Sequence, residues 1–305
     1  MPAKVILNPY ANRWIALERR GELEAALQAA GVEYELVMTE RPRHGDELAE
    51  QAVLDGFSPI ISAGGDGSIN EALNGIGRAA ERTGRPWTPL GVMPLGSAND
   101  LVDNLGLPRE LQAAARVIAG GCTRMLDVCT ANGRYFDNNA AIGLEPFITL
   151  IQQQIHRLKG APRYLAATLL GVHRNPCWNM RLEWDAGSYA GPTTLVTVGN
   201  NPRTGGLFYM TPHADPYDGK LTFVYGYMPT RLQILRLLPR TMKPGVGSYI
   251  EHPNIHEVHA AWLKIHSSEP TPAHTDGEIF DEHAHDLEYR VLPGRLPVLL
   301  PAASS

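Results

Sequence analysis

The sequence contains few cysteines and no pattern typical of a zinc site or a disulfide framework. Its three cysteines are Cys122, Cys129 and Cys177, and no two of them form a C-x-x-C pair. Single cysteines without paired partners provide neither the ligands of a structural zinc site nor the even set of a disulfide-stapled fold. We therefore expect a protein of a reducing compartment such as the cytoplasm.

Long apolar runs and an excess of positive charge are also absent. No run approaches the ~20 apolar residues that span a bilayer, and the N-terminal residues lack the apolar core and cleavage site of a signal peptide. The net charge of −5 argues against nucleic acid as a partner, because phosphate backbones demand a basic face. The 44% hydrophobic content is typical of a soluble protein with a sizeable core, and 305 residues allow two domains.

A glycine-rich stretch, Ala63-Gly-Gly-Asp-Gly-Ser-Ile-Asn-Glu71, lies between an expected strand and an expected helix. Glycines allow the backbone to turn and to approach a ligand closely, and the N–H groups at a helix start favour an anion. A phosphate is the expected ligand, with an ordinary turn as the alternative. A second loop, Gly96-Ser-Ala-Asn-Asp100, also follows a short apolar run, so we expect the two loops to share one site.

The first 120 residues alternate between apolar runs of strand length and segments with helical periodicity. We expect strands at 4–7, 33–38, 59–63 and 89–93, and helices at 15–30, 47–54, 69–80 and 108–119. Such alternation predicts a parallel sheet covered by helices on both faces. Its ligands gather at the carboxyl ends of the strands, where Asn8, Thr39 and both glycine loops lie.

After residue 120 the pattern changes. A hairpin is predicted around Asn132-Gly133, a strong turn dipeptide. Helical stretches at 146–172 and 230–238 interrupt apolar/polar alternation at 178–184, 193–199, 221–227, 258–266 and 287–292. We therefore predict an α/β nucleotide-binding domain at 1–130 and a mainly antiparallel β-sandwich domain at 131–305.

Polar residues of the two loops have alternative roles. Asp66, among the glycines, favours a magnesium bridge or a hydrogen bond to the loop, with an Asx-turn as the structural alternative. Glu71 fits a capping role as well as a functional one. Ser97 and Asn99 offer short polar side chains to a nucleotide, and Asp100 fits a helix cap or a metal site.

Two acidic turns lie in the second half of the chain. Asp215, Asp218 and the carbonyl of Lys220 provide the hard oxygen ligands that divalent cations prefer, although a plain loop is the alternative. In the second turn, Asp276-Gly-Glu278, one carboxylate is suited to accept a proton from an attacking hydroxyl. The pair His283-Ala-His285 is more typical of a solvated acidic loop than of a metal site, and we assign no histidine to catalysis.

Taken together, GGDGSINE followed by PLGSAND resembles the signature of the diacylglycerol kinase catalytic domain family, which contains bacterial lipid kinases and is similar to sphingosine kinases. The resemblance covers nearly the whole chain, and its motifs occur in the family's order. They are Asn8-Pro9, Thr39 with His44, Gly64 to Glu71, Gly96 to Asp100, Phe136 to Asn139 with Gly143, Asn200 to Gly206, Asp218-Gly219 and Asp276 to Glu278.

The resemblance implies transfer of the γ-phosphate of Mg-ATP to a lipid hydroxyl, foremost that of diacylglycerol. It implies that Glu278 accepts the proton, with Asp276 beside it and Asp66 also in the catalytic set. The nucleotide-binding residues that it implies are Asn8, Thr39, Gly64, Gly65, Asp66, Gly67, Ser68, Asn70, Glu71, Ser97, Asn99 and Asp100. The magnesium ligands that it implies are Asp215, Asp218 and the carbonyl of Lys220.

Some positions depart from the family pattern. Ser97 replaces the usual threonine but keeps the hydroxyl, whereas Asn12 and Arg43 stand where glycines are common, which leaves that part of the nucleotide grip less defined. NAD kinases and phosphofructokinases also contain GGDG loops. A sphingosine-type kinase and a non-catalytic lipid-binding member are further alternatives, and the sequence does not specify the lipid.

A lipid acceptor requires a protein that reaches a membrane from the water side. The segment 229–243 combines leucines with four cations; on a helix, Leu232 and Leu235, together with Leu238, share one side, while Arg236 and Arg240 share another. This pattern predicts a peripheral contact with the inner face of the membrane, and a helix packed on the β-domain is the alternative. A homodimer is left open.

Overall fold

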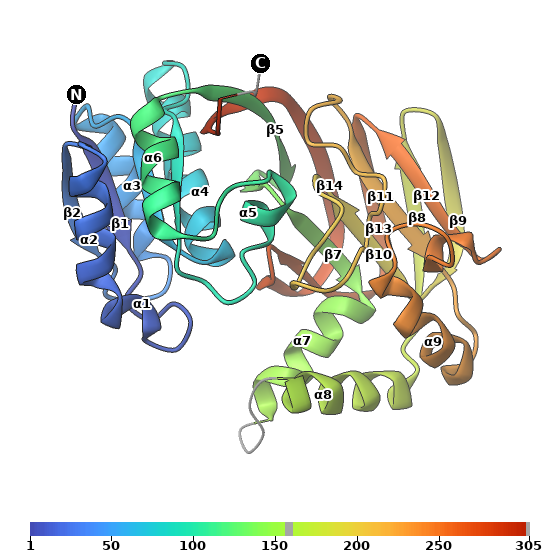
Figure 1. Cartoon of the computed structure of the whole chain (residues 1–305). Helices are drawn as coiled ribbons and strands as arrows, with labels where there is room; N and C mark the ends of the chain where they lie inside the picture. Colours follow the sequence, from blue (N-terminus) through green and yellow to red (C-terminus); the bar gives the residue numbers. More distant parts are fainter. Residues whose placement is uncertain (156–160, 303–305) are drawn as a thin grey trace. The chain divides into compact units, whose positions relative to one another are not determined.

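The computed structural model describes residues 1–155 and 161–302, which divide into two compact units (Figure 1). The first unit comprises Met1–Val128, Arg134–Asp137 and the end of the chain from Leu292. The second comprises Cys129–Gly133 and Asn138–Val291. The sequence analysis placed a single domain boundary at residue 130. It did not predict that the chain returns to the first unit at residues 134–137 and again from Leu292.

The first unit is a parallel sheet with helices on both faces, as the alternating pattern predicted. Its strands are β1 (Ala3–Leu7), β2 (Tyr34–Met38), β3 (Ile60–Gly64) and β4 (Leu90–Pro94), in the order β2-β1-β3-β4. The end of β14 (Glu278–Leu299) pairs in parallel with β4 at Val298 and Leu90. Strands β3 and β4 are buried throughout, because both faces of the sheet are covered.

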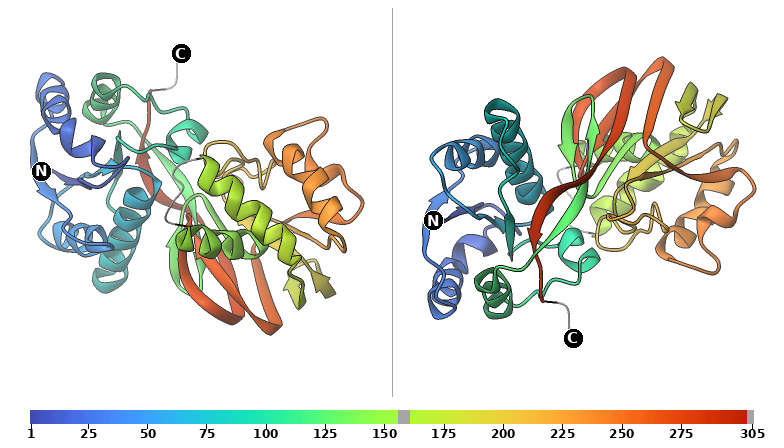
Figure 2. Two further views of the ribbon diagram at one scale, coloured as in Figure 1. Left: turned by 90° about the horizontal axis from the view of Figure 1, so that it is seen from below. Right: turned by 90° about the horizontal axis from the view of Figure 1, so that it is seen from above.

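Helices cover both faces of this sheet. They are α1 (Ile15–Glu18), α2 (Arg20–Ala29), α3 (His44–Leu54), α4 (Asp66–Thr83), α5 (Asp100–Asn104) and α6 (Leu111–Gly120). Figure 2 shows α2 and α6 on one face and α3 and α4 on the other. Leu23 and Leu27 of α2 share a core with Leu111 and Ile118 of α6, over Val5 and its neighbours in the sheet.

The second unit is mainly antiparallel, as predicted. Its strands are β7 (Asn139–Gly143), β8 (Trp178–Trp184), β9 (Gly187–Thr193), β10 (Leu195–Gly199), β11 (Leu221–Gly226), β12 (Ile255–Ala260) and β13 (Trp262–Thr275), followed by β14. The main sheet has the order β12-β11-β10-β7-β13-β14, and β8 pairs with β13 and β9. Trp184 packs on Phe223 at 5.4 Å between ring centroids, which joins β8 to β11 across the interior.

Helices cover one side of the second unit. They are α7 (Leu144–Gln154), α8 (Ala161–Arg174), α9 (Arg231–Leu237) and the short 3-10 helices η1 (Leu238–Met242) and η2 (Tyr249–Glu251). A capping box between Thr230 and Gln233 begins α9. Ile148, Val172, Ile234 and Tyr249 share one buried cluster, so these helices pack on a common core.

Several details differ from the predicted elements, and the helix predicted at 15–30 is two helices, α1 and α2. The predicted helix at 146–172 is two helices, and its residues 156–160 lie outside the described part. The predicted strand at 258–266 is divided at Ala261 between β12 and β13, and the predicted strand at 287–292 belongs to the much longer β14. The hairpin at Asn132-Gly133, between β5 (Thr123–Ala131) and β6 (Arg134–Phe136), has the positive φ angles that its turn requires.

Candidate functional site

The two glycine loops of the first unit contact each other, as the sequence predicted. A Cβ placed on Gly96 would lie 2.3 Å from the Cα of Gly65, and one on Gly65 would lie 3.0 Å from the Cα of Gly96. The N–H of Leu95 also donates to the carbonyl of Gly64 at 2.8 Å. Glycine is therefore required at both positions by backbone approach, and the loops form one surface at the carboxyl ends of β3 and β4.

Neighbouring segments extend this surface along the same edge of the sheet. Thr39 donates its N–H to the carbonyl of Leu7 at 2.9 Å, and Asn8 donates its N–H to the carbonyl of Ala63 at 3.0 Å. The side-chain amide of Asn8 donates to the Ser68 hydroxyl at 3.1 Å. The N-terminus of α4, an 18-residue helix, begins at this edge and favours an anionic ligand.

Asp66 binds the start of α5. Its Oδ1 accepts the N–H of Leu101 at 3.2 Å, and the backbones of Asp100 and Asn99 also donate to its carboxylate. Burial raises the pKa of this carboxyl above its usual value, and the backbone hydrogen bonds oppose that rise. Of the roles considered for Asp66, the structure contains the hydrogen bond to the second loop.

The second loop holds one buried acceptor without a partner. Asn99 lies in the left-handed region, with φ 54°, and its side-chain amide donates to the carbonyl of Gly96 at 3.1 Å. Among the described residues, nothing donates to its buried Oδ1. Ser97 is exposed at the tip of the loop, whereas Asp100 is buried. A buried amide oxygen without a donor, beside a close backbone contact, fits a site for a ligand that donates a hydrogen bond to it.

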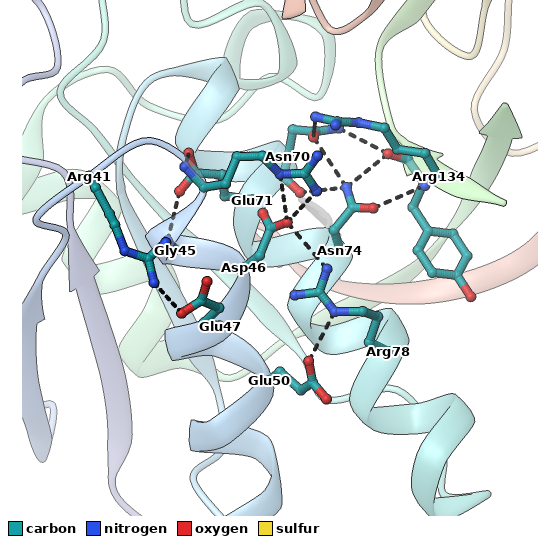
Figure 3. A network of polar contacts seen from close by, with 12 residues as sticks. Arg41, Gly45, Asp46, Glu47, Glu50, Asn70, Glu71, Asn74, Arg78 and Arg134 are labelled. Carbon is teal, nitrogen blue, oxygen red and sulfur yellow. Dashed lines mark hydrogen bonds and ion pairs between the residues drawn. The ribbon is translucent and has the colours of Figure 1, made fainter. Parts of the chain in front are cut away.

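Glu71 caps a helix, but the helix is α3 and not the one in which Glu71 lies. Its carboxylate accepts the N–H of Arg43 at 2.9 Å and the N–H of Gly45 at 2.8 Å (Figure 3). Arg43 stands in the left-handed region, with φ 63°, a conformation that favours glycine. Glu71 therefore fixes the segment between Thr39 and α3 to the first glycine loop.

Charged side chains continue this link between α3 and α4. Arg78 donates to Asp46 at 3.2 Å and to Glu50 at 2.9 Å, and Arg43 donates to the same Asp46 at 2.6 Å (Figure 3). The Asp46 side chain is buried. Because a buried carboxylate that loses its partners is costly, these contacts hold the two helices in one arrangement.

Asn70 is occupied elsewhere on α4. Its side-chain amide donates to the carbonyl of Tyr135 at 3.0 Å, and Asn74 binds both the carbonyl and the N–H of Tyr135. Asn70 is buried and supports β6 within the first unit. Gly67 and Ser68, expected in the loop before the helix, lie in the first turn of α4.

In the second unit, the turn that contains Asp276 and Glu278 binds the start of β7. Asp276 Oδ1 accepts the N–H groups of Asn138 at 3.2 Å and Asn139 at 2.9 Å. Asn138 in turn accepts the N–H of Asn200 at its carbonyl, at 2.9 Å. Three motifs far apart in the sequence are thereby brought together, with Glu278 half-buried at the start of β14.

The sequence did not predict the polar group beside this turn. His274, which is 2% exposed, lies 3.1 Å from Glu145 between Nε2 and Oε1, and Asn139 donates to the same oxygen at 3.2 Å. Thr204 donates its hydroxyl to Asn139 Oδ1 at 2.9 Å. His274 lies two residues before Asp276 of the DGE turn, and this position is a signal by which the sequence could have identified it. No local sequence pattern identifies Glu145.

An apolar cavity of about 90 Å³ lies under the helices of the second unit. Its polar members include Glu145 and Thr204, at the group just described. Its apolar walls include Leu144, Ile148, Phe208, Met210, Met228, Ile234, Leu237, Leu238, Tyr249 and Ile255. The cavity therefore suits a ligand that has an apolar body and a polar end.

The acidic turn predicted to bind magnesium is exposed, and its two carboxylates accept hydrogen bonds from backbone N–H groups of the same turn. Asp215 accepts the N–H of Tyr217 at 3.0 Å, and Asp218 accepts the N–H of Lys220 at 2.8 Å, each through Oδ1. Two carboxylates and a carbonyl in one turn are donors of the kind that Mg²⁺ prefers. No cluster of three or more metal-ligating side chains occurs in 1–155 or 161–302, and the histidine pair at 283–285 forms no such cluster.

Two family models together match most of the chain. Residues 2–131 match the family model of the diacylglycerol kinase catalytic domain, and residues 138–300 match that of the YegS C-terminal NAD kinase beta sandwich-like domain. Among the helices that the structure describes, none is long and apolar enough to cross a membrane.

Individual relatives cover most of the chain. A "Probable lipid kinase YegS-like" of Chromohalobacter salexigens is 31% identical over 265 residues, which is 86% of this chain and 82% of the relative. A "Diacylglycerol kinase" of Bacillus subtilis is 29% identical over 280 residues, covering 90% and 89%.

Solved structures share the fold. A diacylglycerol kinase structure from Bacillus anthracis has a TM-score of 0.75 at 21% identity, covering 100% of this chain and 98% of that one. An NAD kinase from Archaeoglobus fulgidus in complex with ATP has a TM-score of 0.52 at 12% identity, covering 98% and 94%.

Proposed function

Because the chain belongs to the diacylglycerol kinase catalytic domain family, we propose that it is an ATP-dependent lipid kinase. It transfers the γ-phosphate of Mg-ATP to a lipid hydroxyl, foremost that of diacylglycerol to give phosphatidic acid. The observation that carries the choice of a lipid is the apolar cavity, whose polar end is formed by Glu145 and Thr204. NAD and sugar phosphates lack the apolar body that such walls would bury.

The first unit supports ATP as the donor. Because Gly65 and Gly96 have no side chains, phosphates can approach the backbone at their contact. The buried Oδ1 of Asn99 can accept a hydrogen bond from the nucleotide. The N-terminus of α4 adds a favourable field for the phosphate charge. These features fit the nucleotide, with Glu71 and Asp66 holding the surrounding loops in place.

The second unit supports the acceptor side of the reaction. As the acceptor oxygen bonds to the γ-phosphorus and the bond to the β-phosphate oxygen breaks, Glu278 takes the hydroxyl proton, and ADP leaves. Asp276 positions the turn through Asn138 and Asn139. The oxygens of the Asp215–Lys220 turn would hold magnesium, which would supply charge neutralisation when bound.

The cavity wall includes part of α9. The cavity has a volume of about 90 Å³, and its mainly apolar lining suits an acyl chain. Ile234 and Leu237 of α9 form part of that wall. We place the enzyme on the cytoplasmic side of the membrane, where ATP is present.

The test is phosphate transfer from radiolabelled ATP to a panel of diacylglycerol, sphingosine, ceramide, phosphatidylglycerol, NAD and fructose 6-phosphate. Asp66→Ala should lower turnover of the preferred lipid by about 100-fold or more, whereas Glu33→Ala, at an exposed carboxylate, should not. Labelling of sphingosine alone would assign a sphingosine-type kinase, and labelling of NAD would assign an NAD kinase. No transfer to any acceptor would refute catalysis and leave a lipid-binding protein.

A further inference from the structure

Exposed leucines gather on two neighbouring helices of the second unit. Leu165, Leu169 and Leu170 of α8 are close to half exposed, and Leu232 and Leu235 of α9 are 55% and 39% exposed. We call these five residues the α8–α9 face. The two helices pack together, and the Asn175 amide after α8 donates to the carbonyl of Pro229 before α9 at 3.4 Å. Exposed leucines on two helices that contact each other indicate an interaction surface.

The core of the unit does not require these leucines. The opposite sides of the same helices bury Ala167 and Val172 of α8, and Ile234 and Leu237 of α9, in the common cluster. Each helix is therefore already held by one apolar side, and its second apolar side faces solvent. For α9, one side packs on the unit, as the alternative prediction stated, and the other side is exposed, while the predicted membrane contact stays a prediction.

The charge around this face has one sign. Residues 161–174 and 229–248 contain no aspartate or glutamate, although the whole chain has a net charge of −5. Four exposed cations lie in these segments: Arg174, Arg231, Arg236 and Lys243. An apolar surface bordered by cations complements an anionic lipid surface.

Two residues of the sequence-based hypothesis are excluded from this surface. Arg240 was expected to meet lipid, but it donates to the carbonyls of Gly247 and Ser248 at 3.0 and 2.6 Å and pairs with Glu251. Leu238 was expected beside Leu232, but it lines the cavity. In their place, the exposed Leu165, Leu169 and Leu170 of α8 belong to the α8–α9 face.

We propose that the α8–α9 face docks on the surface of a bilayer that contains anionic lipids. The leucines insert at the headgroup boundary, and Arg231 and Arg236 meet lipid phosphates. A second copy of the chain fits this face poorly, since a two-fold contact would place cations opposite cations. The inference rests on the proposed function, because docking brings the membrane to the outer side of α9, whose inner side lines the cavity.

The test is sedimentation of the full chain with vesicles of phosphatidylcholine and phosphatidylglycerol, at low and high salt. Arg231→Glu with Arg236→Glu should weaken binding at low salt by at least about 25-fold, since each basic residue contributes about a factor of five. Leu235→Gln should weaken binding at both salt concentrations. The matched controls are Arg116→Glu, an exposed arginine of α6, and Leu17→Gln, which is also 39% exposed.

Activity on a short-chain diacylglycerol in detergent micelles separates this inference from the proposed function. The docking variants should phosphorylate the micellar lipid at the wild-type rate. If the wild type phosphorylates nothing but the variants still lose vesicle binding, the kinase assignment fails and the docking face stands. Wild-type vesicle binding by both docking variants would overturn the docking face, as would a dimer in solution that Leu235→Gln dissociates.

Discussion

The contact between the glycine loops provides the sharpest test of the nucleotide site. Replacing Gly96 by alanine adds one methyl group, which would lie 2.3 Å from the Cα of Gly65. Ordinary van der Waals contact begins near 3.4 Å, so the loops must separate by about 1.1 Å. Both sides of the contact are backbone, and neither can move by changing a side-chain rotamer.

Two consequences of that separation can be measured. Overpacking of this kind costs about 1 to 3 kcal/mol, which corresponds to a fall in Tm of about 2 to 12 °C. A misplacement of about 1 Å in a phosphate-binding loop is expected to lower kcat/KM for ATP by about 100-fold. Thermal melts and steady-state kinetics with ATP check the two effects separately.

Two further glycines provide a graded control with the same added methyl group. Gly65→Ala would create a contact of 3.0 Å with Gly96, so its effect should be milder. Gly21→Ala in α2 meets no atom within 4 Å and should stabilise the chain by about 0.5 to 1 kcal/mol. Wild-type Tm and wild-type ATP kinetics for Gly96→Ala would refute the close-approach argument.

Other residues of the site give further predictions. Glu71→Gln replaces one acceptor oxygen by an amide donor opposite a backbone N–H, so it should cost about 1 to 3 kcal/mol in urea unfolding and raise the KM for ATP; no change in either would contradict the capping role. Because burial raises the pKa of Asp66, the folded state favours its protonated form, and this carboxyl destabilises the fold increasingly above pH ~4. Asp66→Asn should therefore gain stability relative to the wild type as the pH rises from ~3 to 7 in thermal melts; a stability difference independent of pH would exclude this cause. Glu278→Gln should depress kcat while sparing the KM for ATP, whereas Asp218→Ala should raise the magnesium concentration needed for half-maximal rate; exchanged effects would reverse the two roles.

The sequence predicted the fold class and the family, both of which are confirmed, because each depends on local patterns. Alternating apolar runs specify parallel strands, and parallel strands bring their carboxyl ends to one edge. The contact between Gly65 and Gly96 follows from that geometry alone. Apolar/polar alternation after residue 120 indicated the antiparallel second domain.

Non-local contacts could not be predicted in the same way. Glu71 caps α3 through N–H groups 28 and 26 residues earlier in the chain, and no spacing rule links them. The pairing of Glu145 with His274 spans 129 residues and depends on how β7 and β13 align. The involvement of Arg240 with the carbonyls of Gly247 and Ser248 removed it from the surface that its helical spacing suggested.

The last strand of the first unit has a consequence for the order in which the protein folds during synthesis. Leu296, Val298 and Leu299 are buried in a unit whose other strands end by residue 136. At about 5 to 20 residues per second, the ribosome needs about 10 to 30 s to translate from there to Leu299. The nascent first unit must wait that long for its missing strand, and most of that time is taken by translation of the second unit. A gene fragment that encodes only residues 1–137 would therefore produce a first unit without the end of β14.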